Sequence, residues 1–275
     1  VDSGGKAVVG TDSKVSTGSL NTQNFPAKTR SGLSGALGDV IDHSPQPGEV
    51  NYDSNNYGNP ATKAHEETHG INSNIANLRH NDGTKTRGFY LLNNKKAILK
   101  SPKVTIHSPK NYLPKGMKGG MYYDYLDRKD RTNDPLYIFD EWTAYLNGGR
   151  SAVDLAQKGM WKWDRGDAVA GPVKFGMYSL ALGMSAQQND PNYWKSKNGE
   201  QFRAFTKFNL ERTVNLFNEG NKIKSLSSSS IHQEASQMLN QLRDTNNPQT
   251  EAMRNFAKNN FNINDPDWTK RVLGF

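Results

Sequence analysis

The segment that most constrains the fold begins at Asn59-Pro60 and carries a helical pattern to about residue 78. Asn is a favoured N-cap, and Pro suits the first helical position because its missing N–H would have no partner there. Side chains at helical spacing then predict one buried stripe, formed by Ala64, Thr68, Ile71, Ile75 and Leu78. A helix with such a stripe has to pack against a core, so this segment is predicted to anchor the folded chain.

Two histidines lie on the face beside this stripe, in the sequence HEETH at 65–69. His65 and His69 are one helical turn apart, so their rings can converge on one point. A hydrolytic zinc site needs three protein ligands, an open position for water and a nearby base. The pattern predicts His65 and His69 as ligands of Zn2+ and Glu66 as the catalytic base. The alternative interpretation is an ordinary polar helix with two partly exposed histidines.

A second helix start follows at Asp134-Pro135, directly before the sequence LYIFDEWTAYLNG. Its apolar side chains predict a core stripe formed by Phe139, Trp142 and Leu146. A neighbouring stripe is predicted from Ile138, Glu141 and Tyr145. Gly148-Gly149 is predicted to end this helix.

With HEETH on one capped helix, the chain resembles the zincin metallopeptidases, structurally over residues 60–150. The resemblance implies a zinc-dependent peptidase with an active-site helix, a strand edge above the cleft and a second helix below it. Asn72 and Ile75 occupy the positions where the metzincin branch has a Gly and its third His. The gluzincin branch takes a Glu from a downstream helix, followed closely by a small residue, which fits Glu141 and Ala144. Glu141 is therefore the third ligand that the resemblance implies.

Other residues could supply the third ligand, and the sequence does not exclude them: His80, Asp82, His107, Asp124 and Asp127. The aspzincin pattern is absent around the last two, and a surface carboxylate is the plain alternative for Glu141. In many gluzincins a carboxylate one turn after the ligand braces a zinc histidine. Tyr145 stands there in this chain, so Asp140 or Tyr145 itself is expected to brace it.

A peptidase also needs a donor to its oxyanion. Tyr145 is the predicted catalytic donor, and the chemically able alternatives are Tyr122, Tyr123, Tyr125 and His107. For a substrate-aligning strand edge, the resemblance points to a hairpin at 88–100. Its two apolar runs flank Asn93-Asn94, and Asn tolerates the positive φ of tight turns. Residues 103–107 are predicted to add a strand, and 108–133 to form loops.

The fold class predicted is α+β and zincin-like: a small mixed or antiparallel sheet, an active-site helix and a mostly helical C-terminal half. Residues 1–58 are rich in Gly, Ser, Asn and Asp and are predicted to be a loop-rich segment packed on the core, with KAVVG and GALGDVID as strands or single helical turns. Residues 59–150 form the predicted zinc-binding core. Residues 151–275 form the predicted helical subdomain, because Met and Phe recur there at helical spacing.

Composition narrows the function classes. The chain has no cysteine, which excludes disulfides and thiolate sites, and no apolar run long enough to span a membrane. Its net charge of +8 favours anionic surroundings, but no aromatic-basic module for nucleic acid is present. The first residue is Val rather than Met, which together with the composition favours a processed, secreted bacterial protein.

These observations predict a secreted zinc endopeptidase that acts on a protein or peptide substrate. One alternative is a non-catalytic binding protein on a degenerate peptidase scaffold, although such a protein has no chemical need for Glu66. Another is a hydrolase of cell-wall peptide crosslinks.

Overall fold

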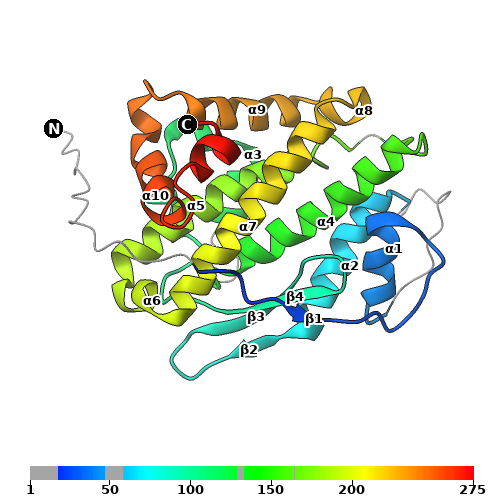
Figure 1. Cartoon of the computed structure of the whole chain (residues 1–275), viewed down its shortest axis with the longest axis horizontal. Helices are drawn as coiled ribbons and strands as arrows, with labels where there is room; N and C mark the ends of the chain where they lie inside the picture. Colours follow the sequence, from blue (N-terminus) through cyan, green and yellow to red (C-terminus); the bar gives the residue numbers. More distant parts are fainter. Residues whose placement is uncertain (1–17, 47–57, 129–132, 164) are drawn as a thin grey trace.

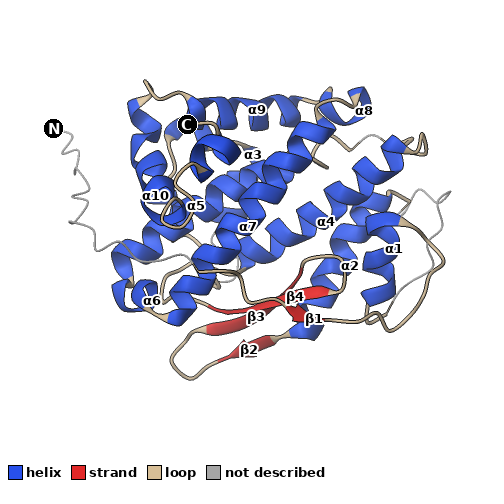
Figure 2. Cartoon of the chain, viewed as in Figure 1, coloured by secondary structure: helices blue, strands red, loops and turns tan. Residues whose placement is uncertain are grey.

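The computed structural model describes residues 18–46, 58–128, 133–163 and 165–275. The fold is mixed α+β, with a small antiparallel sheet at one side of a largely helical body (Figures 1 and 2). KAVVG lies outside the described residues. None of the helices in the described part of the chain has the length and apolar character needed to traverse a bilayer.

The sheet has the strand order β1-β4-β3-β2 and is antiparallel throughout. Its strands are β1 (Gln23–Asn24), β2 (Asn77–Arg79), β3 (Lys85–Tyr90) and β4 (Lys95–Lys100). The predicted hairpin is confirmed as β3 and β4, and β3 lies inside the sheet rather than at an edge. Leu92, Asn93 and Asn94 in its turn all have positive φ, at 66°, 54° and 58°.

The predicted strand at 103–107 is wrong, because this segment forms turns. The backbone N–H of Lys103 donates to Asp190 over 2.8 Å, which ties it to a helix start instead of a strand. The predicted loops at 108–133 are interrupted by short helical turns in their described part: Ser108–Asn111, Lys115–Met117, α3 (Gly120–Tyr122) and Tyr123–Asp127.

Helix α2 (Pro60–Ile75) begins where the sequence predicts. The side chain of Asn59 accepts hydrogen bonds from the backbone of Ala61 and Thr62, at 3.0 and 3.4 Å. The helix ends earlier than its apolar pattern suggests. Leu78 lies in β2 and is 58% exposed, so it is not part of the buried stripe.

Helix α4 (Tyr137–Gln157) runs through Gly148-Gly149, so the predicted end at these glycines is wrong. Both glycines are sites of close approach. A Cβ atom at Gly148 would lie 2.6 Å from the carbonyl oxygen of Ala61 on α2, and one at Gly149 would collide with the carbonyl of Ala168. The glycines therefore permit packing rather than ending the helix.

The remaining described helices follow the Pro and Ser signals of the sequence. They are α5 (Gly171–Asn189), α6 (Pro191–Lys195), α7 (Lys197–Gly220), α8 (Lys224–Ser227), α9 (Ser230–Arg243) and α10 (Glu251–Phe261), with short turns at Pro248–Thr250 and Thr269–Leu273. Asp190, Ser196 and Ser229 each cap a helix with a side-chain oxygen.

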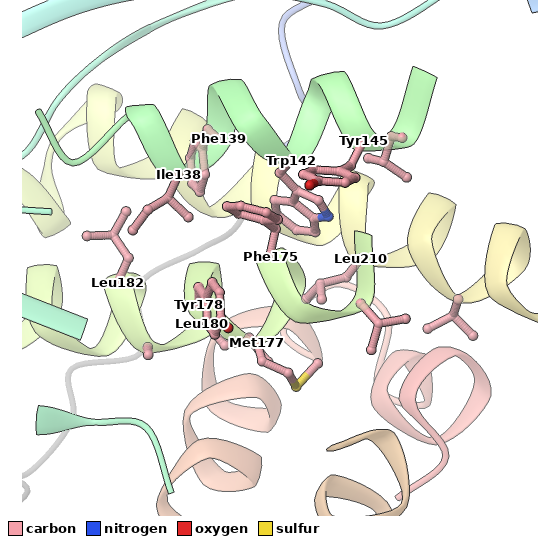
Figure 3. Packing of buried hydrophobic residues seen from close by; sticks show 14 of the residues in the cluster. Ile138, Phe139, Trp142, Tyr145, Phe175, Met177, Tyr178, Leu180, Leu182 and Leu210 are labelled. Carbon is pink, nitrogen blue, oxygen red and sulfur yellow. The ribbon is translucent and has the colours of Figure 1, made fainter. Parts of the chain in front are cut away.

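The main core is built around α4, which crosses the middle of the molecule (Figure 1). Trp142 is fully buried among aromatic and aliphatic side chains of α4, α5 and α7 (Figure 3). Its indole N–H donates to Thr213 Oγ1 over 2.9 Å, so the buried polar group is satisfied. This single cluster contains residues from Ala61 to Leu273, so the segments 59–150 and 151–275 share one core.

A second, smaller cluster joins the N-terminal segment to α2. GALGDVID forms most of helix α1 (Gly35–His43), which is longer than the strand or single turn predicted for it. Leu37, Val40 and Ile41 are buried against Ala64 and Ile71 of α2. Within the described part of 1–58, a regular helix packs against α2.

Candidate metal centre

The crossing of α2 and α4 brings His65, His69 and Glu141 together. The Nε2 atoms of the two histidines are 3.1 Å apart. Oε2 of Glu141 lies 3.5 Å from His65 Nε2 and 3.7 Å from His69 Nε2. Among the described residues this is the one group of His and acidic side chains with donor atoms close enough to share an ion. The three ligands predicted from the sequence therefore converge.

Small residues allow the two helices to approach this closely. Ala64 and Ala144 are fully buried. Gly148 faces the backbone of Ala61 and lies one turn beyond Ala144 on α4, and a Cβ atom there would come within 3.4 Å of His65 Cβ. Ala144 is the small residue expected after Glu141. It is one of several small residues that set the distance between the two helices.

The geometry of the donor set fits a small divalent cation. Tetrahedral zinc with bonds of about 2.0–2.1 Å places its ligands roughly 3.3–3.4 Å apart. The three distances of 3.1, 3.5 and 3.7 Å lie around this value. Two imidazoles and one carboxylate also make up a known ligand set of catalytic zinc sites.

Burial supplies an independent argument for a cation. Glu141 is 3% exposed, and its Oε2 has no hydrogen-bond donor in the described part of the chain. A buried carboxylate oxygen without a partner costs free energy that a cation would offset. Burial alone would raise the pKa of Glu141, but His65 and His69 hold it well below its usual range. The carboxylate is therefore ionised, as a metal ligand must be.

Asp140 braces His69 from behind. Its Oδ2 lies 2.9 Å from Nδ1 of His69, which leaves Nε2 to face Glu141. Its Oδ1 accepts a hydrogen bond of 2.7 Å from Asn72. Burial alone would lower the pKa of His69, but bonding to and attraction by Asp140 and Glu141 raise it to about 10. Of the two bracing residues proposed from the sequence, Asp140 is the one in contact with a ligand histidine through a hydrogen bond.

An arginine on the sheet completes this arrangement and was missed by the sequence analysis. Arg87 on β3 pairs with Asp134, and its Nη1 lies 3.4 Å from Asp140 Oδ2. Asn72 was missed as well, and its Oδ1 accepts from the backbone of Tyr90 over 2.7 Å. These partners are far apart in the sequence, so no local spacing could have indicated them.

His65 is held by packing. Its ring meets Tyr145 edge to face, with centroids 4.5 Å apart, and Nδ1 has no hydrogen-bond partner among the described residues. Tyr145 in turn stacks on Phe175, with ring centroids 5.3 Å apart. Both belong to the buried cluster drawn in Figure 3. Tyr145 is 6% exposed, and burial raises the pKa of its hydroxyl. From α4, Tyr145 therefore packs against a proposed ligand on α2. Its role as oxyanion donor stays a prediction.

Glu66 directly follows His65 on α2. Its side chain is exposed, and no described residue holds its carboxylate through a hydrogen bond or ion pair. The His69 side chain is 23% exposed, so solvent reaches this member of the cluster. The role of Glu66 as catalytic base stays a prediction.

The other candidates do not join the cluster. His80 lies 2.8 Å from Thr86 Oγ1, and Nδ1 of His107 bonds the carbonyl of Leu126 at 2.7 Å. Asp82 accepts from Thr84, and Asp127 pairs with Lys110. Neither these residues nor Asp124 belongs to the group of converging donors. Among the alternative tyrosines, Tyr122 is buried and Tyr123 is 57% exposed.

Comparison with known proteins found no matching family model, no matching curated protein and no matching solved structure. The chain's own residues therefore supply the observations that favour a metal centre. Three observations carry it: converging donors, an orphaned buried carboxylate oxygen and a braced histidine.

Proposed function

We propose that the protein is a zinc-dependent metallopeptidase of the zincin type, with His65, His69 and Glu141 as metal ligands. The observation that carries this proposal is the convergence of three donor atoms from α2 and α4, one of them the orphaned Oε2 of Glu141. The site fits zinc better than calcium or magnesium, because two of its three donors are imidazole nitrogens.

The chain's own residues have separate roles in this reaction. His65 and His69 offer Nε2, and Asp140 fixes the orientation of the second imidazole through Nδ1. Zinc, when bound, supplies a Lewis acid that polarises the scissile carbonyl and acidifies water. Glu66 accepts the proton of the attacking water and delivers it to the leaving amine, so the peptide bond is replaced by a carboxylate and an amine.

The substrate is proposed to be a protein or peptide in a secreted setting. The net charge of +8 favours anionic targets, and a peptide crosslink of a cell wall is one substrate with such surroundings. Tyr145 is retained as the proposed oxyanion donor on chemical grounds, although its ring is packed against His65.

The test is a Glu66→Gln variant, compared with the wild type for zinc content and for cleavage of casein and of cell-wall peptides. Zinc is expected to stay bound at one equivalent, because Glu66 is not a ligand, while cleavage falls by at least about a hundredfold. Activity that survives this change would defeat the mechanism. Zinc without cleavage of any peptide by the wild type would favour a non-catalytic binding protein.

A further inference from the structure

A cavity of about 640 Å³ lies on the other side of α4 from the metal centre. Its walls come from α1, the β3–β4 turn, α4 and α7. On α4 the lining residues are Leu146, Arg150 and Asp154, which are four residues apart. At about 100° per residue, they lie roughly 140–220° around the helix from Glu141. The cavity is therefore separate from the proposed peptidase site.

The acidic side chains of this cavity are already paired. Asp154 accepts from Arg150 Nε over 2.6 Å and from the backbone of Ala36 over 2.9 Å. Glu219 accepts from Arg150 Nη1 over 2.7 Å. Asp39 accepts from the backbone of Asn93 over 2.8 Å. Arg150 and each of these carboxylates thus have partners within the protein.

Arg212 differs from Arg150, the other cation of the lining, because its partners are neutral. Its Nη1 donates to the side-chain oxygen of Asn209 over 3.0 Å, and its Nη2 donates to that of Asn147 over 3.1 Å. No carboxylate of the described ranges forms an ion pair with it. Burial lowers the pKa of Arg212 to about 10, with no nearby charge to offset the effect. A guanidinium has five N–H donors, so three remain for a ligand.

The position of this guanidinium is fixed by the core. The amide nitrogen of Asn147 donates to the carbonyl of Tyr90 over 3.1 Å and to Thr68 Oγ1 over 3.3 Å. These bonds orient the amide so that its oxygen faces Arg212. Phe208 lies under the guanidinium, with its ring centroid 5.6 Å away. An arginine that is held in this way is pre-organised for an anion.

The rest of the lining is apolar on one side. Leu91, Leu146 and Leu216 are buried residues of this wall. Leu92 also lines it and has a φ of 66°, which a bulky side chain rarely adopts. The cavity thus combines a leucine wall with a single uncompensated cation.

We propose that this cavity binds a small organic carboxylate with an apolar body. The carboxylate pairs with the free N–H groups of Arg212, and the hydrocarbon part packs on the leucines. A planar carboxylate matches the fork of a single guanidinium, whereas a phosphate dianion would leave charge uncompensated here. The volume is in the range of ordinary small-molecule sites. This proposal stands independently of the peptidase activity.

The test is isothermal titration calorimetry with hexanoate and phenylacetate. One site per chain is expected for at least one of them, with a dissociation constant of about 1 mM or tighter. Hexan-1-ol, which lacks the charge, and inorganic phosphate, which lacks the apolar body, are expected to bind at least about tenfold more weakly. Arg212→Gln is expected to lose at least about tenfold in carboxylate affinity. Arg271→Gln, an exposed arginine paired with Asp265, is the matched control and should bind as the wild type does.

One further variant and one metal-free titration separate ligand binding at this site from effects of folding and of metal. Leu216→Trp keeps Arg212 but fills the cavity, so it should also abolish binding, and circular dichroism checks that both variants fold. Because a carboxylate can also ligate zinc, the titration is repeated on metal-stripped protein, where an unchanged affinity is expected. The proposal is overturned if neither probe saturates, if folded Arg212→Gln binds like the wild type, if phosphate or hexan-1-ol binds equally well, or if binding disappears with the metal.

Discussion

The carboxylate of Glu141 is the residue-scale feature on which the metal centre depends. It is buried at the crossing of two helices, and its Oε2 faces two imidazole nitrogens rather than a hydrogen-bond donor. A folded chain keeps an ionised carboxylate in such a place only when a positive charge is nearby. The two histidine rings are the groups that face this oxygen, and a divalent cation held between them would supply the charge.

Replacing Glu141 with Gln is expected to weaken zinc binding by more than the roughly 10–100-fold that is typical of changes to partners of a ligand. The reason is that an anionic ligand is lost while the two histidines stay in place. Competition with a chelating dye measures the affinity. Glu211→Gln, an exposed position on α7, is the control. Equal affinities of the two variants would show that Glu141 is not a ligand.

Asp140 contacts His69 and is not itself a proposed ligand, so its replacement should weaken zinc binding less than replacement of Glu141 does. Asp140→Asn is expected to lower zinc affinity by about 10–100-fold, because the amide holds the imidazole less firmly. Asp134→Asn is the matched control, since Asp134 shares Arg87 with Asp140 but does not touch a histidine. Its zinc affinity should stay within about threefold of the wild type. If both variants lose affinity equally, Arg87 rather than Asp140 organises the site.

At the scale of elements, the separation of α2 and α4 decides whether the site exists. Three ligands from two helices can converge only when the helix backbones approach closely, and Gly148 allows this because its Cα faces the carbonyl of Ala61. Gly148-Gly149 is typical of a helix end by its sequence, yet α4 continues through it. Glycine has two uses, conformational freedom and small size, and local sequence does not distinguish them.

Gly148→Ala is expected to destabilise the protein by about 1–3 kcal/mol, because the added methyl group forces the helices apart. Urea unfolding measures this change. Zinc affinity should fall in the same variant, since the distance between Glu141 and the histidines increases. Gly120→Ala is the control, because a Cβ atom at Gly120 meets open space. If Gly148→Ala is as stable as the wild type, the crossing of α2 and α4 has space for the added methyl group, and Gly148 is not required for the close approach.

At the scale of the whole molecule, metal binding is expected to raise the free energy of unfolding. One continuous core surrounds α4, so the helix that carries Glu141 cannot shift without disturbing it. A ligand at a hundredfold excess over its dissociation constant stabilises the native state by about 2.7 kcal/mol. Removing such a ligand from a chain of this size lowers the melting temperature by about 5–10 °C.

Treatment with EDTA is therefore expected to lower the melting temperature of the wild type, and added zinc should restore it. Differential scanning fluorimetry provides the measurement. Glu141→Gln should show little response to either treatment, because it has lost the site. An equal response of this variant would assign the stabilising metal to a different location.

The sequence by itself determined the local features of this protein. Asn59-Pro60 fixes the start of α2, the HEETH spacing puts both histidines on one face, and Asn93-Asn94 marks the hairpin turn. These features depend on neighbours within a few residues, which is the range over which capping, helical periodicity and turn preference act. The helical C-terminal half was predictable for the same reason.

Only the tertiary structure decided which distant groups meet. It brought Glu141 rather than His80 or Asp82 to the histidines, made Asp140 the brace of His69 and placed Arg87 behind it. It also left Arg212 beside a leucine-lined cavity without a counter-charge. These outcomes follow from how whole helices pack, and packing depends on the combined shape of side chains that are far apart in the sequence.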